Sequence, residues 1–281
     1  METVKISDLF SRDLYNGVNS SMQVPDWVFK PDQWSSAFLR GLRRVAKDLS
    51  HLRLWEIGVG SGVNLILLRK WVESGTWYYS DYDSRCVPLA TANLESARVD
   101  LSQYRPLPGK WDLTTPPADN GYSAPVADVV FGCLPQVPTE MDLSSGDRIA
   151  HYYNPFCYPG SKLHAVGLGL NEALLAQAQN VLTPGGVAIL NLGGRPGLLR
   201  LKEMFRCSGY QPKVIYEEMI PQHKETSLAS FADLEAAGQR DFEFFADTNG
   251  FVRINARKAE DRRVSELPVF HKIYVIAGTL I

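Results

Sequence analysis

Short apolar runs and segments of helical spacing alternate along most of this chain. Runs rich in β-branched and aromatic residues predict strands at 52–57, 76–83, 126–134, 187–194 and 213–220, with a weaker candidate at 106–113 that contains prolines. Helical spacing of apolar residues predicts helices at 38–49, 63–73, 87–99, 167–182 and 198–210. Strands that alternate with helices of this size indicate an α/β protein with a mostly parallel sheet.

The two ends of the chain depart from this alternation. Residues 1–50 are expected to form an N-terminal extension with lid helices, and residues 51–281 one continuous domain. Within that domain, 221–243 predicts a helical insertion, while 251–259 and 269–281 predict terminal strands. The charge-rich stretch 257–263 (RKAEDRR) is expected to be an exposed turn.

Composition narrows the class of protein further. The chain has 281 residues, 45% of them hydrophobic, and a net charge of -2, which gives no positive field for nucleic acid or an anionic membrane. No apolar run approaches the roughly 20 residues of a membrane span, and the start of the chain does not resemble a signal peptide. The four cysteines form no CxxC pair, so we expect no metal site and a reducing, cytoplasmic setting.

The stretch that follows the first strand is the first candidate for a binding site. It reads Glu56-Ile57-Gly58-Val59-Gly60-Ser61-Gly62, and such a glycine turn lets a backbone approach a ligand beside a helix N-terminus. A dinucleotide fingerprint needs a glycine at position 63, and a P-loop needs a lysine there; the residue is Val63. This speaks against an NAD-linked oxidoreductase. The remaining pattern, E-x-G-x-G-x-G, resembles the first motif of class I S-adenosylmethionine (SAM) methyltransferases.

That resemblance implies a Rossmann-like fold with a seven-stranded sheet, helices on both faces, and a set of cofactor contacts. Glu56 would accept a hydrogen bond from the ammonium group of SAM, and an acid after the second strand would bind the ribose; Asp81 is preferred there and Asp83 is the alternative. Asp112 follows the third strand, where the family has an acid that contacts adenine. The full set of cofactor residues that we expect is Trp34, Glu56, Gly58, Gly60, Gly62, Asn64, Asp81, Tyr82, Asp112 and Cys133.

The tip of the fourth strand has an unusual sequence. In an α/β sheet of this kind, ligands lie at the carboxyl ends of the strands near the topological switch point. Many methyltransferases carry Asn/Asp-Pro-Pro-Tyr there to hold a planar nitrogen, whereas this chain has Cys133-Leu134-Pro135-Gln136. The acceptor is therefore expected to be something other than a planar amine or amide.

Several blocks are similar to the methyltransferase region of methionine S-methyltransferases, which make S-methylmethionine from methionine and SAM. The blocks are GCLPQ (132–136), NPFCYPGSKLHAVGLGL (154–170), NLGGRPG (191–197), RDFEFF (240–245) and VFKPDQWSSAFLRGLRR (28–44). The plant enzymes carry a long aminotransferase-like C-terminal domain that this chain lacks, so we expect a stand-alone bacterial-type form.

The resemblance also suggests roles in methyl transfer. A thioether has no proton to lose, so we expect direct transfer to the sulfur of methionine without a general base, with S-adenosylhomocysteine as product. Residues that would wall the reacting atoms are Cys133, Pro135, Gln136, Tyr152 and Tyr153, and those that would bind the substrate are Arg195, Asn154, Tyr153 and Gly194. Trp34 could close over the cofactor. A homo-oligomer is compatible with these expectations.

Other interpretations stay open at this point. The acceptor could be another small thioether or an amine, and the protein could be a SAM-binding scaffold without activity. Cys133 as a covalent nucleophile would need His151 or His164 nearby. A metal site built from His151, Cys157 and His164 lacks the usual ligand spacing.

Overall fold

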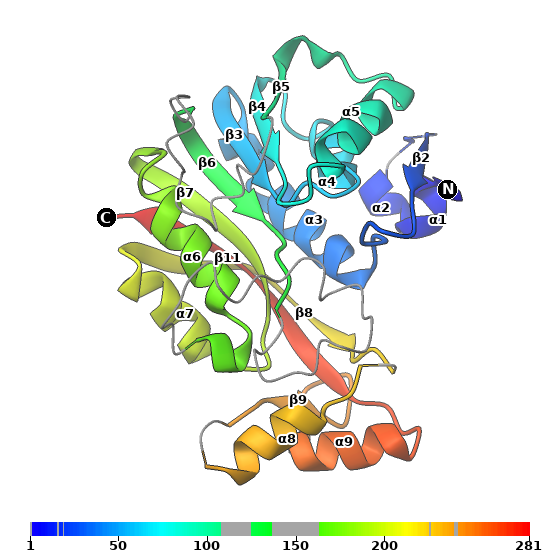
Figure 1. The fold of residues 1–281 in the computed structure, drawn as a ribbon, viewed down its shortest axis with the longest axis vertical. Helices are drawn as coiled ribbons and strands as arrows, with labels where there is room; N and C mark the ends of the chain where they lie inside the picture. The colour runs from blue at the N-terminus through cyan, green and yellow to red at the C-terminus, as the bar shows by residue number, and fades with distance from the viewer. Residues whose placement is uncertain are drawn as a thin grey trace.

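The computed structural model describes residues 2–15, 17–18, 20–107, 125–136, 163–224, 226–238 and 241–281. Its centre is a nine-stranded sheet with the order β10-β9-β11-β7-β6-β3-β4-β5, in which β8 pairs with β11 (Figure 1). The strands are β3 (Leu52–Ile57), β4 (Gly75–Ser80), β5 (Tyr104–Pro106), β6 (Ala127–Gly132), β7 (Leu182–Gly193), β8 (Tyr210–Pro221), β9 (Phe244–Phe245), β10 (Arg253–Ile254) and β11 (Phe270–Leu280).

Seven of these strands form the sheet that the sequence predicts. Strands β5, β4, β3, β6 and β7 are parallel, while β11 is antiparallel to both β7 and β8. The expected seven-stranded sheet is extended at one edge by β9 and β10, which have two residues each. β10 lies within the predicted strand segment 251–259, and β9 is not predicted. The third strand lies at Tyr104–Pro106, at the start of the segment expected to hold it rather than within it.

Helices cover both faces of the sheet. On one face lie α3 (Gln33–Val45), α4 (Val63–Leu68) and α5 (Cys86–Ser96), and on the other α6 (Gly169–Ala178) and α7 (Leu198–Cys207) (Figure 1). Leu39 and Leu42 of α3 pack in the same core as Leu54 of β3 and Val275 of β11. The helix α3 is therefore packed into the main body, even though the predicted extension 1–50 includes it.

The start of the chain is not purely helical. Strands β1 (Glu2–Lys5) and β2 (Ser21–Val24) form a separate antiparallel pair, with the short helices α1 (Ile6–Leu9) and α2 (Arg12–Tyr15) between them. The N-terminal lid was expected to be helical, but it also contains a two-stranded antiparallel sheet. The pair is anchored to the main body by α5, because Asn93 accepts a hydrogen bond from the Gln23 backbone at 2.7 Å.

A helical insertion lies between β8 and β11, as predicted, at the lower end of the sheet in Figure 1. It contains α8 (Ala229–Ala236) and α9 (Ala256–Val264), and short 3-10 turns lie elsewhere at Ala46–Leu49, Leu101–Gln103 and His164–Val166. Of the strand predicted at 251–259, only Arg253–Ile254 is a strand (β10), because α9 begins at Ala256. The turn predicted at 257–263 is wrong, because α9 covers all of it. Across the described ranges, no helix combines the length and the apolar character needed to cross a membrane.

Candidate active site

The glycine turn joins β3 to α4 with three residues in left-handed conformation. Gly58, Gly60 and Gly62 have φ angles of 71°, 52° and 79°, which disfavour any residue with a Cβ. Two of them also lack room for a side chain: a Cβ on Gly58 would lie 2.9 Å from Leu134 and one on Gly62 would lie 2.9 Å from Ala90. The turn is therefore fixed between the tip of β6 and the helix α5.

Glu56 is the second-last residue of β3, and its buried carboxyl group uses only one of its two oxygens for a hydrogen bond within the described residues. Its side chain is 1% exposed, and Oε1 accepts a hydrogen bond from Asn64 Nδ2 at 2.7 Å. The other oxygen, Oε2, and the amide oxygen of Asn64 have no partner among the described residues. Burial raises the pKa of Glu56 to about 8, and the nearby charge of Asp81 adds to the effect. A cationic group of a ligand would stabilise the ionised carboxylate and give Oε2 a hydrogen-bond partner.

Asp81 follows β4 and is directed toward the glycine turn. It is 5% exposed, and its two oxygens accept hydrogen bonds from the backbone N–H groups of Gly60 and Asp83, both at 2.9 Å. Burial raises the pKa of Asp81 to about 6. Asp83 instead forms an ion pair with Arg85, whose guanidinium lies over the Trp27 ring at 4.3 Å. Of the two candidate acids, Asp81 is therefore the one that borders the glycine turn.

The tip of β6 is packed between the glycine turn and the end of β7. Leu134 is buried against Gly58, and Gln136 exchanges two hydrogen bonds with the Gly193 backbone, donating at 3.0 Å and accepting at 2.7 Å. Cys133 accepts a hydrogen bond at its Sγ from Asn191 Nδ2 at 3.2 Å. Burial raises the pKa of Cys133 to about 12, so it stays a thiol at neutral pH and is not poised as a nucleophile.

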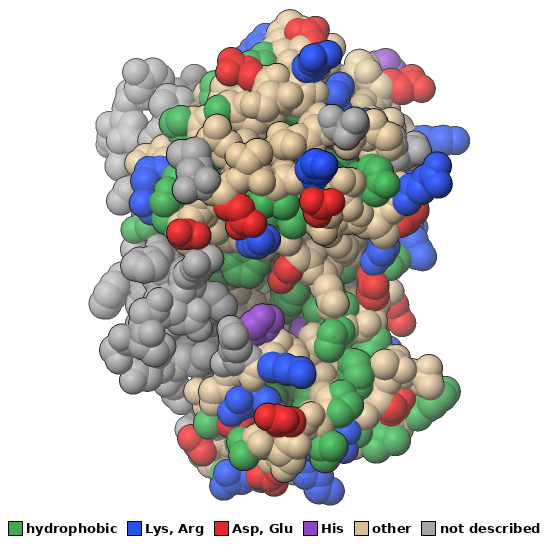
Figure 2. Space-filling model, turned by 90° about the vertical axis from the view of Figure 1, so that its right-hand side faces the viewer, with side chains coloured by type: hydrophobic (Ala, Val, Ile, Leu, Met, Phe, Trp, Pro, Cys, Tyr) green, Lys and Arg blue, Asp and Glu red, His purple; other side chains and the backbone are tan. Residues whose placement is uncertain are grey.

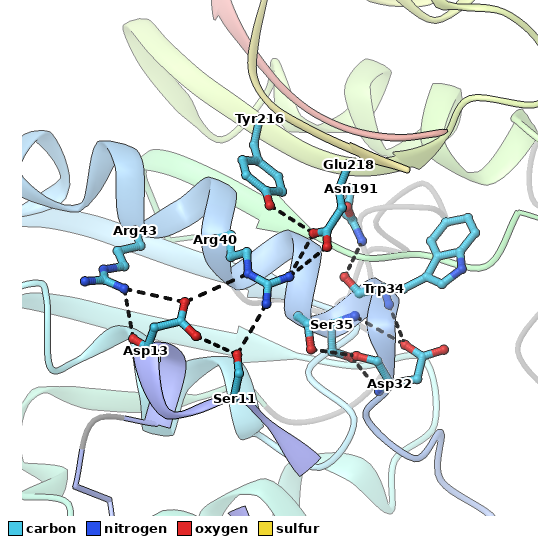
Figure 3. Close-up of polar contacts among 11 residues, drawn as sticks. Ser11, Asp13, Asp32, Trp34, Ser35, Arg40, Arg43, Asn191, Tyr216 and Glu218 are labelled. Carbon is cyan, nitrogen blue, oxygen red and sulfur yellow. Dashed lines mark hydrogen bonds and ion pairs between the residues drawn. The ribbon is translucent and has the colours of Figure 1, made fainter. Parts of the chain in front are cut away.

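The start of α3 lies beside this tip (Figure 3). Asp32 caps the helix by accepting hydrogen bonds from Trp34 N and Ser35 N, which fixes where Trp34 enters the structure. Asn191 of β7 donates to the Trp34 carbonyl at 2.9 Å as well as to Cys133. Its side-chain oxygen Oδ1 is buried and has no partner within the described part of the chain. Asn191 thus links α3, β6 and β7. It is not among the site residues predicted from the sequence.

A second buried group lies just beyond the end of β7. Arg195 is 8% exposed, and none of the described residues gives its guanidinium a hydrogen bond or a carboxylate partner. It lies 5.7 Å from the Trp34 ring and 5.3 Å from the Phe231 ring, and burial lowers its pKa to about 10. The neighbouring Gly194 has no room for a side chain, since a Cβ there would lie 2.7 Å from Tyr274.

His271, the second residue of β11, lies close to the same buried groups and is not among the residues predicted from the sequence. Its ring lies 5.7 Å from the Trp34 ring, and neither of its nitrogens has a partner among the described residues. The backbone pair formed by Gly194 N and Lys272 O, 2.7 Å apart, brings the end of β7 beside His271. Asn191 is the first residue of the NLGGRPG block, whereas the signal for His271 was a polar residue inside an apolar run.

Some predicted residues cannot be placed. Asp112, His151, Tyr152, Tyr153, Asn154 and Cys157 lie outside the described residues. His164 is buried under α6, where its ring contacts Gly169, and Pro135 is half-buried at the tip of β6. Tyr82 is half-buried between Asp81 and Asp83.

The strand order and the position of the glycine turn are those of the class I methyltransferase fold. A solved structure from Pyrococcus horikoshii, described as an RNA methyltransferase, matches with a TM-score of 0.51 and 11% identity over 96% of this chain and 98% of that one. At this level of identity the match supports the fold alone. No family model matches the chain.

Sequence comparison confirms the narrower resemblance. The chain is similar to the methionine S-methyltransferase of Zea mays, with 27% identity over 85% of this chain and 24% of that protein. It is also similar to the methionine S-methyltransferase of Arabidopsis thaliana, with 26% identity over 90% of this chain and 26% of that protein. The chain thus spans about a quarter of the length of the curated relatives it matches.

Proposed function

We propose that this protein is a SAM-dependent methyltransferase whose acceptor is the thioether sulfur of methionine, and whose product is S-methylmethionine. The observation that carries the proposal is the buried carboxyl group of Glu56, whose Oε2 has no hydrogen-bond partner among the described residues. It lies beside a glycine turn in which Gly60 N donates a hydrogen bond to Asp81. Similarity to methionine S-methyltransferases supports the choice of acceptor. Residues 51–281 together with α3 would form the catalytic unit, and the β1–β2 segment would act as its cover.

The residues at the glycine turn suit the parts of SAM. The free Oε2 of Glu56 would accept from the ammonium group, since an unpaired buried carboxylate is otherwise costly. Asp81 keeps lone pairs for the ribose hydroxyls after accepting its two backbone hydrogen bonds. Tyr82 would border the ribose, and Asp112, which lies outside the described residues, would border the adenine. Asn64 would orient Glu56.

When bound, SAM supplies an electrophilic methyl group on a sulfonium. The methionine sulfur forms the new bond to this methyl with its own lone pair, the old carbon–sulfur bond breaks, and no proton moves. The chain therefore has to align the reactants, which can contribute about 7–11 kcal/mol through proximity and orientation. Cys133 and Pro135 would line the space around the reacting atoms, together with Tyr152 and Tyr153. Gln136 would hold the segment that carries Cys133 and Pro135 at a fixed distance from β7.

The polar end of methionine needs a different environment from its sulfur. Arg195 is a buried cation with no carboxylate partner among the described residues, which suits the carboxylate of an amino acid. Gly194 allows close approach to it, and Asn154 would add a further contact. Trp34 lies next to Arg195 and would shield the pocket from water.

Product analysis tests the proposal directly. Purified protein is incubated with SAM and a panel of amino acids and amines, and the products are identified by mass spectrometry. Formation of S-methylmethionine with equal formation of S-adenosylhomocysteine is expected. Turnover of an amine but not of methionine would overturn the choice of acceptor, and SAM binding without turnover of any acceptor would favour a scaffold.

A further inference from the structure

The pocket beyond β7 contains more than the arginine assigned to the substrate carboxylate. His271 is 2% exposed, yet neither ring nitrogen has a hydrogen-bond partner among the described residues. Buried polar groups are normally paired, so an unpaired imidazole in a pocket indicates a missing ligand. Figure 2 shows a hollow between the main body and the insertion that carries α8 and α9.

The surroundings of His271 determine what kind of ligand group it can bind. Burial, together with the positive charge of Arg195, lowers the pKa of His271 well below 6.5, so the ring is neutral and keeps one lone pair as an acceptor. Gln222 lies next to the Pro221–Phe270 pair of β8 and β11, and its side-chain oxygen is also buried with no partner in the described ranges. The pocket therefore combines one cation with neutral acceptors.

An α-amino acid carries the two groups that such a pocket would satisfy. Its carboxylate suits Arg195, and its ammonium suits acceptors that carry no positive charge. We propose that His271 accepts a hydrogen bond from the ammonium group of the substrate while Arg195 binds the carboxylate, so that the pair selects zwitterionic amino acids over other thioethers. This inference rests on the function proposed above and adds a residue that determines specificity.

Two substrate analogues separate these contacts. 4-(Methylthio)butanoate keeps the thioether and the carboxylate but lacks the ammonium, and methioninol keeps the ammonium but lacks the carboxylate. In the wild type, methionine should exceed both analogues in kcat/KM by about 10- to 100-fold, as expected for one lost hydrogen bond to a charged group. His271→Leu should lower the preference over 4-(methylthio)butanoate to a few-fold and leave the preference over methioninol unchanged.

Two further variants serve as controls. His271→Gln keeps an acceptor and should retain part of the preference, and it also covers the case in which His271→Leu does not fold. Arg195→Gln should show the opposite pattern, losing the preference over methioninol only. The Kd for SAM, measured by calorimetry, should change less than about 2-fold in the His271 variants, since the residue lies in the pocket beyond β7 and not at the glycine turn.

The outcomes separate this inference from the proposed function. If the wild type does not methylate methionine, the proposed function fails. If it does, and His271→Leu keeps its preference over 4-(methylthio)butanoate, then His271 does not bind the ammonium and the inference alone fails. A loss of preference over methioninol in His271→Leu would place the histidine on the carboxylate and would also overturn it.

Discussion

At the scale of single residues, the candidate site is defined by polar groups that folding buries without satisfying them. Among the described residues, Glu56, Asn191 and His271 have buried side-chain atoms without a hydrogen-bond partner, and Arg195 is a buried cation with no carboxylate partner. Each such group costs free energy in the absence of a ligand. Their shared location makes ligand binding the simplest physical reason for keeping them.

The choice between Asp81 and Asp83 leads to a prediction at this scale. Asp81→Asn should weaken SAM binding about 10- to 100-fold, because it removes the charge that strengthens hydrogen bonds to the ribose hydroxyls. Asp83→Asn is the matched control and should change the Kd less than about 3-fold, because Asp83 pairs with Arg85. Calorimetric titration with SAM measures both. A larger effect of Asp83→Asn would assign the ribose to the other acid.

The sequence was informative about some of these residues and silent about others. The placement of Glu56, Asp81 and the glycines around one turn could be predicted because it depends on local spacing after a strand, and their roles in binding stay predictions. Asn191 and His271 could not, because their roles depend on which strands become neighbours. Asn191 acquires its meaning only when β7 brings it beside Cys133 and the start of α3.

At the scale of elements, the parallel core and the first helix of the insertion were predictable, and the helix α9 was not. The strands β3, β4, β6, β7, β8 and β11 follow the apolar pattern closely. In 251–259, alternating apolar residues favoured a strand, but Asn255 accepts a hydrogen bond from Lys258 N and starts α9 at Ala256. A local cap and good helix formers outweighed a short alternation there.

The link between β6 and β7 gives a prediction at the scale of elements. Gln136→Ala removes two buried hydrogen bonds and leaves the N–H and C=O of Gly193 unpaired. The free energy of unfolding should fall by about 2–4 kcal/mol, measured by urea denaturation. Gln103→Ala, at an exposed glutamine, is the control and should stay within about 0.5 kcal/mol of the wild type. A change below about 1 kcal/mol for Gln136→Ala would show that the link is not structural.

At the scale of the whole molecule, the N-terminal segment and the sheet are joined by polar contacts across α3. Arg40 of α3 pairs with Glu218 of β8 at 2.9 Å and also donates to Ser11 of the segment between β1 and β2 (Figure 3). Arg43 donates to the Asp13 carbonyl at 2.8 Å. A helix that the sequence assigned to a separate extension thus connects the beginning of the chain to its last strands.

The buried carboxylate of Glu56 should make the stability of the whole molecule depend on pH. Its pKa is raised from 4.5 to about 8, so the folded protein holds a proton that the unfolded chain releases at neutral pH. The stability that this proton provides is fully present below about pH 4.5 and is lost progressively as the pH rises to about 8. Between about pH 6.5 and pH 8 the loss should be about 1.5 kcal/mol.

The comparison with Glu56→Gln isolates this effect. His271 is neutral above about pH 6.5 in both the folded and the unfolded protein, and Asp81, with a pKa of about 6, is already largely ionised there, so neither dominates this window. Unfolding measured at intervals from about pH 6.5 to 8 should show stability falling in the wild type relative to Glu56→Gln. Saturating SAM should reduce the slope in the wild type, because a bound ammonium favours the carboxylate and binding stabilises the folded state. Equal slopes in the two proteins without SAM would show that burial does not raise the pKa of Glu56, and would contradict this prediction.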